Sequence, residues 1–180
     1  VLSGALSIAR EREEGTFDQL LVAPYTPREI LLGKGISTVI TSIMQTFFIV
    51  LVAMFWFRIP FQGSIWLLSG AILLFIITGA AIGLCISSFS QSLQQAIVGT
   101  FLLVVPTVML SGFATPISSM PEFFQDLTLL NPMRYGLELI QRIFLEGAGF
   151  MDLWPLFGAI TLVTIGTAAA AIFSFHRKIS

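Results

Sequence analysis

The side chains that most often carry catalysis are scarce in this sequence. It contains one histidine, His176, and one cysteine, Cys85. His176 lies beside Arg177 and Lys178, where it is better explained as part of a membrane-surface anchor than as a base. Ser111 has no His or Lys partner in a nearby apolar segment that could activate it as a nucleophile. We therefore expect no catalytic residue, and an intramembrane enzyme is the weakest functional hypothesis.

The sequence also lacks the motifs of metal and phosphate sites. No group of His, Cys and carboxylate residues has the spacing of a metal site, so we expect no metal ligands. Gly33-Lys34 is similar to the end of a phosphate-binding loop, but Arg28 stands where that loop has glycine. Gly35 replaces the Ser or Thr that would follow the lysine. The chain is therefore not expected to bind ATP or another cofactor itself.

The composition excludes a soluble domain. Of 180 residues, 56% are hydrophobic and 11% are charged, whereas a typical soluble domain has about 25% charged residues. A sphere of this size cannot bury so much apolar surface. The formal net charge of −1 also excludes the basic surface that a nucleic-acid partner requires. Lipid is the expected solvent, and membrane lipid an expected partner.

Charged residues divide the chain into apolar segments, because a charge at the centre of a membrane helix costs about 2.5–3.5 kcal/mol. The longest charge-free stretch, 59–121, is interrupted at 87–95 by Ser and Gln, which we place in a surface turn. The prediction is one transmembrane domain over 1–180, an all-α polytopic helical bundle. The predicted spans are 30–57, 64–87, 93–112 and 153–175, preceded at 1–9 by the end of a truncated span.

The distribution of Lys and Arg predicts the orientation. Six fall on one side of the predicted spans, namely Arg10, Arg12, Arg28, Lys34, Arg177 and Lys178, and three on the other, Arg58, Arg134 and Arg142. The richer side is expected to be cytoplasmic. Within the spans, Gly79 and Gly83 form a G-x-x-x-G pair, which fits either ordinary close packing or a dimer face.

The cytoplasmic segment 10–29 contains the start signals of two helices. Thr16 and Gln19 fit a capping box that opens a short helix with Phe17, Leu20 and Leu21 on one apolar face. A second box, Thr26-Pro27-Arg28-Glu29, predicts the start of the helix that becomes the next span.

Two roles fit the short cytoplasmic helix. It could lie at the headgroup level with its apolar face on the bilayer, or it could dock in a groove of a protein partner. Its polar side carries Glu11, Glu13, Glu14 and Asp18, and an acidic rim suits a protein groove better than an anionic leaflet. Both readings remain open from the residues alone.

On the opposite side, 119–149 has a helical pattern of its own. Asn131-Pro132 is an N-cap followed by proline at the first helical position. Charges recur every four residues at Arg134, Glu138, Arg142 and Glu146, and Leu137, Ile140 and Phe144 form a neighbouring apolar stripe. Phe123, Phe124, Leu127 and Leu130 form an earlier amphipathic piece, and Gly147 and Gly149 close the unit. Both pieces are too short to span, which predicts a re-entrant or interfacial hairpin.

Apart from Lys34 near the start of 30–57, no predicted span contains an Asp, Glu, Lys, Arg or His residue, which disfavours a proton relay or an ion-coupled carrier. The energy for any transport would therefore come from a separate subunit. The lack of coupling charges in the spans, together with a cytoplasmic helix that could dock on a cytosolic protein, indicates a membrane subunit driven by a separate ATPase.

Several ordered motifs resemble bacterial type-2 ATP-binding-cassette (ABC) exporter permeases, and most closely their multidrug-efflux branch. The first motif is EREEGTFDQLLVAP at 11–24, followed by PREILLGK at 27–34. The second is SGFATP at 111–116, followed by Met120-Pro121, Asn131-Pro132 and Tyr135. The resemblance covers essentially the whole chain. Because that family has six spans, it implies that the chain is the C-terminal part of a permease.

The resemblance assigns roles to two sets of residues. A coupling helix that docks on an ATPase would contain Glu14, Gly15, Thr16, Phe17, Leu20 and Leu21. Paired extracytoplasmic re-entrant helices would contain Pro121, Asn131, Pro132, Arg134, Tyr135, Glu138 and Arg142.

The resemblance also implies an assembly. Two permease halves, identical or different, would associate with two cytosolic ABC ATPase subunits in the bacterial cytoplasmic (inner) membrane. ATP and Mg would be bound by the ATPase, and the permease would be a transport subunit rather than an enzyme.

The expected function is export of small amphipathic or drug-like compounds. Phe101, Met109 and Phe113 could line a path for such cargo, although a stripe of this kind is also ordinary packing. The alternatives are a non-transporting membrane scaffold or assembly subunit, and a permease for another cargo such as lipid or polysaccharide.

Overall fold

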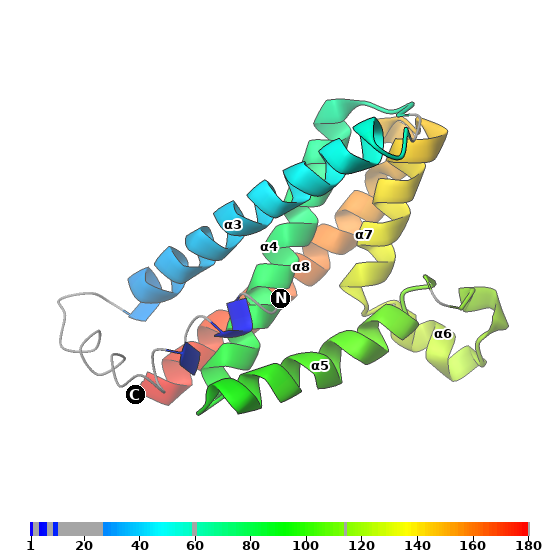
Figure 1. The fold of residues 1–180 in the computed structure, drawn as a ribbon. Helices are drawn as coiled ribbons and strands as arrows, with labels where there is room; N and C mark the ends of the chain where they lie inside the picture. Colours follow the sequence, from blue (N-terminus) through cyan, green and yellow to red (C-terminus); the bar gives the residue numbers. More distant parts are fainter. Residues whose placement is uncertain (2–3, 7–8, 11–26, 59–60, 114, 180) are drawn as a thin grey trace. The chain divides into compact units, whose positions relative to one another are not determined.

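A computed structural model describes residues 1, 4–6, 9–10, 27–58, 61–113 and 115–179. These residues form helices and no strands (Figure 1). The elements are α3 Pro27–Phe55, α4 Ile65–Phe89, α5 Leu93–Met109, the 3-10 helix η1 Ile117–Ser119, α6 Glu122–Thr128, α7 Pro132–Gln141, the π-helix η2 Arg142–Glu146 and α8 Phe150–Ile179.

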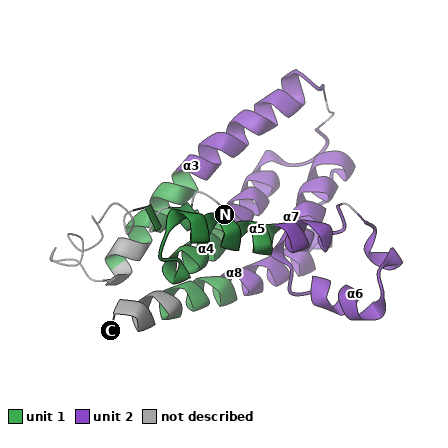
Figure 2. Ribbon diagram, turned by 60° about the horizontal axis from the view of Figure 1, so that its bottom comes forward, with its two compact units in different colours: residues 1–40, 77–104, 165–180 green, residues 41–76, 105–164 purple. Residues whose placement is uncertain are grey.

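The chain forms two compact units, coloured green and purple in Figure 2. The first unit comprises 1–40, 77–104 and 165–180, and the second comprises 41–76 and 105–164. The long helices α3, α4, α5 and α8 each contribute residues to both units.

Three helices among the described residues are long and apolar enough to cross a bilayer: Leu32–Phe55, Ile65–Phe89 and Phe150–Phe173. The fourth predicted span, 93–112, corresponds to a shorter helix. α5 has 17 residues and is about 26 Å long at the usual rise per residue. The helix α8 begins at Phe150, three residues before the predicted span, because its first turn accommodates the carboxylate of Asp152 at the positive end of the helix dipole.

Small side chains pack the first unit. A Cβ atom added to Gly83 would overlap the carbonyl oxygen of Val1 and lie 3.1 Å from the Cα of Gly4. Gly79 faces the same segment, since a Cβ there would lie 3.5 Å from the Val1 side chain. The G-x-x-x-G pair is therefore used for close packing within the chain, with the buried Ala5 against this part of α4.

The core of the second unit is made of large aliphatic side chains. Leu139 and Ile143 from the α7 segment are fully buried with Leu68 and Ala71 of α4 and with Leu153 and Ile160 of α8. Gly136 allows α7 to approach α4, because a Cβ there would overlap the ring of Phe75. Burial of these side chains is what fixes α7 against the two long helices.

Six hydroxyl side chains in the long helices are satisfied locally. Each donates to the backbone carbonyl four residues earlier, as polar groups must when the surroundings offer no water. These bonds are Thr38 to Lys34, Ser69 to Ile65, Ser88 to Leu84, Thr100 to Ala96, Thr161 to Phe157 and Thr164 to Ile160, at 2.6–2.9 Å. Ser88 thus lies inside α4, and the predicted surface turn is confined to 90–92.

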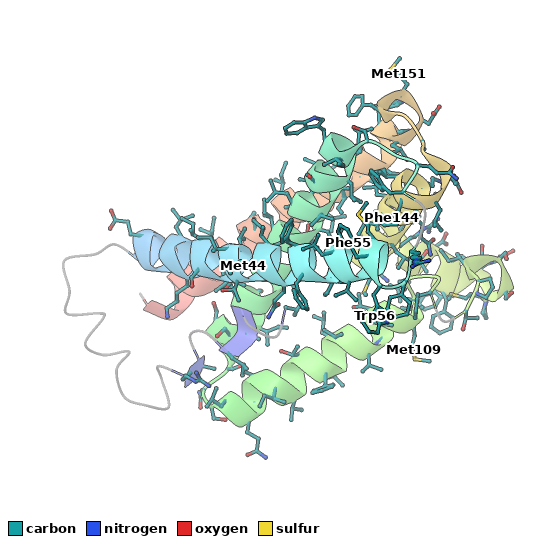
Figure 3. All side chains as sticks on the ribbon, turned by 45° about the horizontal axis from the view of Figure 1, so that its top comes forward. Met44, Phe55, Trp56, Met109, Phe144 and Met151 are labelled. Atoms are coloured by element: carbon teal, nitrogen blue, oxygen red, sulfur yellow. The ribbon has the colours of Figure 1, made fainter. Side chains whose placement is uncertain are left out.

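The outer surface of the long helices is apolar. Phe47, Phe48 and Ile49 of α3 and Leu162 of α8 are all more than 60% exposed. Met44 of α3 is also exposed, and its position on the helix can be followed in Figure 3. A surface of this kind requires lipid around it. The fold is an all-α polytopic membrane bundle.

Candidate functional site

The helix α5 ends ten residues before the predicted extracytoplasmic segment 119–149. Gly112 adopts a left-handed backbone conformation with φ 88°, which glycine tolerates without steric cost. The Ser111 hydroxyl donates to the Val108 carbonyl oxygen (2.6 Å) and accepts from the Phe113 N–H (3.2 Å). These residues stop the helix at Met109, three residues before the end of the predicted span 93–112.

Asn131 joins two helix ends. Its side-chain oxygen accepts from the N–H of Met133 (2.9 Å), which caps α7 as the sequence predicts. Its Nδ2 atom donates to the carbonyl oxygen of Thr107 (2.7 Å), in the last turn of α5. The last four carbonyls of a helix have no donor within that helix, so an amide here is stabilising. Asn131 is 7% exposed, and one buried side chain therefore connects α5 to α7.

A second set of polar contacts holds α6 to α7. The side chain of Arg134 donates through Nη1 to the hydroxyl of the fully buried Thr128. That hydroxyl donates to the carbonyl oxygen of Gln125 (2.7 Å). The hydroxyl of Tyr135 donates to the carbonyl oxygen of Leu129 (2.7 Å). Arg134 and Tyr135 are therefore placed to close the turn between the two short helices.

The charges of α7 do not form the continuous four-residue ladder that the sequence predicts. Glu138 and Arg142 pair, with 2.9 Å between Oε1 and Nη2 and both side chains partly exposed. Arg134 instead bonds to Thr128, away from that pair. A partly exposed pair of this kind contributes about 0.3–0.5 kcal/mol, so it adds little to stability.

The apolar stripe of α7 also differs from the prediction. The buried positions are Gly136, Leu139 and Ile143, whereas Leu137 is outside the core cluster. Ile140 and Phe144 pack at the edge of that cluster. Only part of the predicted stripe therefore faces the core.

The helix changes from α to π after Gln141. The N–H of Gln62, in the loop before α4, donates to the carbonyl oxygen of Phe144 (3.2 Å). The N–H of Ala148, which an α-helix would direct to that carbonyl, donates to Arg142 instead (3.2 Å). Gly147 ends the turn with φ 65°. The wider turn thus makes one carbonyl available to a distant loop, and Phe61 packs edge-to-face on Phe144 at 5.2 Å.

Of the remaining predicted site residues, two prolines are described and the coupling residues are not. Pro121 is the N-cap of α6, with its carbonyl oxygen accepting from the N–H groups of Phe124 and Gln125, and Pro132 is the first residue of α7. The predicted coupling residues Glu14, Gly15, Thr16, Phe17, Leu20 and Leu21 lie outside the described residues.

Ser87 contacts the chain just before the predicted coupling segment. It is fully buried in α4, and its hydroxyl oxygen accepts from the backbone N–H of Ala9 (3.0 Å). Ala9 is itself fully buried. Ser87 is predicted at the junction of the span 64–87 and the polar stretch 87–95. Its contact with Ala9 could not be predicted, because the two residues are 78 positions apart.

We expect Ser87→Ala to loosen this attachment. The substitution leaves the buried N–H of Ala9 without the serine oxygen, at a cost of about 1–2 kcal/mol. Hydrogen exchange of the permease in membranes should therefore be faster at residues 9–10. Ser87→Thr, which keeps the hydroxyl, is the matched control, and equal exchange in both variants would contradict the role of Ser87.

The features above define the class of protein: a polytopic helical membrane protein with paired short helices beside its long helices. The chain belongs to the ABC-2 type transporter family, whose sequence profile matches residues 1–145.

Named relatives agree with this membership. The chain is 35% identical over 175 residues to the "Probable multidrug ABC transporter permease YbhR" of Escherichia coli K12, covering 97% of this chain and 48% of the relative. It is 35% identical over 182 residues to the E. coli "Inner membrane transport permease YhhJ", covering 99% and 48%. The Bacillus subtilis "Linearmycin resistance permease protein LnrN" is 26% identical over 172 residues, covering 96% and 44%.

The chain spans about half the length of these relatives. No solved structure gives a significant match to it.

Proposed function

We propose that this chain is part of the membrane permease subunit of an ATP-driven ABC exporter for small amphipathic or drug-like compounds. Membership of the ABC-2 family, with relatives named as multidrug permeases along nearly the whole chain, is the observation that carries the proposal. The cargo class rests on those names and on the apolar surface of the helices. The proposed location is the bacterial cytoplasmic membrane.

The distribution of charge supports an external energy source. Neither α4 nor α5 contains an Asp, Glu, Lys, Arg or His residue. An ion-coupled carrier needs such groups near the bilayer midplane. ATP and Mg would therefore act on a separate ABC ATPase, and a second permease half, identical or different, would complete the path.

The coupling role belongs to the helix predicted at residues 16–23. In this proposal Phe17, Leu20 and Leu21 dock in a groove of the ATPase, and Glu14 and Gly15 shape the approach. The attachment of Ala9 to Ser87 would tie the chain before this segment to α4. At the other end, α6 and α7 would be the re-entrant helices near the exit of the path.

The experiment is co-purification of the full-length permease with its ATPase, followed by ATP turnover with and without permease. Phe17→Asp should weaken association about 30-fold, the effect of losing a binding hot spot of about 2 kcal/mol, and should abolish permease-dependent turnover. Phe17→Leu keeps the apolar contact and should retain both. If the correctly inserted Phe17→Asp permease binds and stimulates normally, the short helix is an interfacial anchor and the scaffold hypothesis takes over.

A further inference from the structure

An apolar groove of about 490 Å³ lies between α3 and α4 within the second unit. Its volume falls within the range of about 300–1,000 Å³ that is usual for ligand sites. The α3 side is lined by Ile43, Thr46, Phe47, Val50, Leu51 and Met54. The α4 side is lined by Phe61, Ile65, Leu68, Ser69, Ile72 and Leu73.

The groove has a fixed floor. Leu68 is buried in the core of the second unit, and Phe61 and Ile72 pack against the same core. The opposite wall is a single helical stripe, since Ile43, Phe47 and Met54 are spaced by four and seven residues. The α4 face cannot turn to fill the space because Leu68 and Ile72 already pack in the core.

The length of the groove matches one leaflet of a bilayer. From Ile43 to Met54 the α3 wall rises through eleven residues, which is about 16 Å. The hydrocarbon core of a bilayer is about 30 Å thick, so one leaflet is about 15 Å. A single acyl chain extended along the helices would occupy this depth.

The residues between the two lining segments have the chemistry of a headgroup level. Trp56, between the two segments, is 81% exposed, and Trp66, next to the lining residue Ile65, is 87% exposed. Aromatic side chains of this kind gather at the membrane surface. Arg58 is exposed and lies in the chain between the lining residues Met54 and Phe61. Figure 3 shows Phe55 and Trp56 at the end of α3, where this loop begins. The Lys and Arg distribution places this loop on the extracytoplasmic side.

We propose that the groove between α3 and α4 binds one acyl chain of a glycerophospholipid of the extracytoplasmic leaflet, with its phosphate at Arg58. The lining contains two hydroxyl side chains, Thr46 and Ser69, and the Ser69 hydroxyl already donates to the Ile65 carbonyl oxygen (2.8 Å). The groove lining would therefore select an acyl chain by its length and apolarity, and Arg58 would bind the anionic phosphate. This lipid site is independent of the proposed transport function.

The test is photo-cross-linking of the full-length permease, reconstituted in phosphatidylethanolamine and phosphatidylglycerol with a tracer carrying a diazirine in the acyl chain. Adducts are mapped by mass spectrometry. Leu162 of α8 is 74% exposed and Phe47 is 65% exposed, so both meet surrounding lipid to a similar extent. A bound lipid should give several-fold more adduct at the groove residues than at Leu162, and the excess should fall when unlabelled lipid is added.

Two sets of variants separate the acyl and phosphate contacts. Ser69→Phe fills the groove and should remove the excess, whereas Ala169→Phe, on an exposed position of α8, should leave it unchanged. Thr46→Phe fills the groove from the opposite wall and replaces Ser69→Phe if that variant does not fold. Arg58→Gln should lower occupancy about fivefold, which corresponds to the roughly 1 kcal/mol of one cation near an anionic surface, and Arg58→Lys should retain it.

Three results would overturn the proposal. Equal adducts at Phe47 and Leu162 would mean that only unbound surrounding lipid meets the groove. Protection of the groove residues from lipid in the assembled permease would mean that a protein segment covers them. Groove adducts that do not respond to Arg58→Gln would mean that Arg58 does not bind the lipid phosphate.

Discussion

Gly63→Ala should lower the free energy of unfolding of the permease by about 3 kcal/mol, at the upper end of the usual cost of overpacking. A Cβ atom at this position would overlap the carbonyl oxygen of Ile143. The obstacle is backbone in the π-helical turn, so no side-chain rotation can relieve it. The loop before α4 would have to move, and the bond from Gln62 to Phe144 would break.

The measurement is the thermal midpoint of the purified full-length permease, read as loss of the monodisperse peak after heating. A loss of about 3 kcal/mol corresponds to a fall of roughly 6–12 °C for a domain of this size. Gly70→Ala is the matched control, because no atom lies within 4 Å of the added Cβ. In the interior of α4 this change should be neutral or stabilising by up to about 1 kcal/mol. Equal midpoints for the two variants would show that the 61–64 loop does not pack on the π-turn.

Helix positions were the most predictable part of the fold. Lipid enforces long apolar helices, so the gaps between charged residues mark them before any packing is known. Pro27 begins α3 and Gly147 ends the α7 segment, because the backbone preferences of proline and glycine are local properties. Asn131 caps α7 for the same reason.

Contacts between distant residues were not predictable. A four-residue charge repeat fits an uninterrupted α-helix, so the sequence around Arg142 does not predict the π-turn. The donor that uses the freed carbonyl is Gln62, more than 80 residues earlier. Leu139 and Ile143 are core residues because the turn and the approach at Gly136 set which face meets α4.

The hydrogen bond from Asn131 to the Thr107 carbonyl oxygen was also not predictable from the sequence. A capping asparagine uses its oxygen, and the sequence does not show what its NH₂ group meets. The structure places the Thr107 carbonyl there, so α7 and the end of α5 depend on one residue. The coupling segment is a different case, since its proposed role rests on sequence alone.

Asn131→Asp should separate the two functions of this side chain. The carboxylate still accepts from the Met133 N–H and is as good an N-cap as asparagine. It cannot donate to the Thr107 carbonyl oxygen, and in this buried position two oxygen atoms would face each other. We expect a loss of about 2–3 kcal/mol at neutral pH, because a buried charge and an acceptor are both left without a donor.

The pH dependence of this variant distinguishes the lost donor from general damage. As the pH falls toward about 4, the Asn131→Asp carboxyl group becomes protonated and regains an O–H that can donate to Thr107. The thermal midpoint of the variant should therefore recover relative to wild type measured at the same pH. Asn131→Ala loses both contacts and should show no such recovery. If both variants follow the wild-type pH profile at a constant offset, the bond to Thr107 contributes nothing, and Asn131 acts on α7 alone.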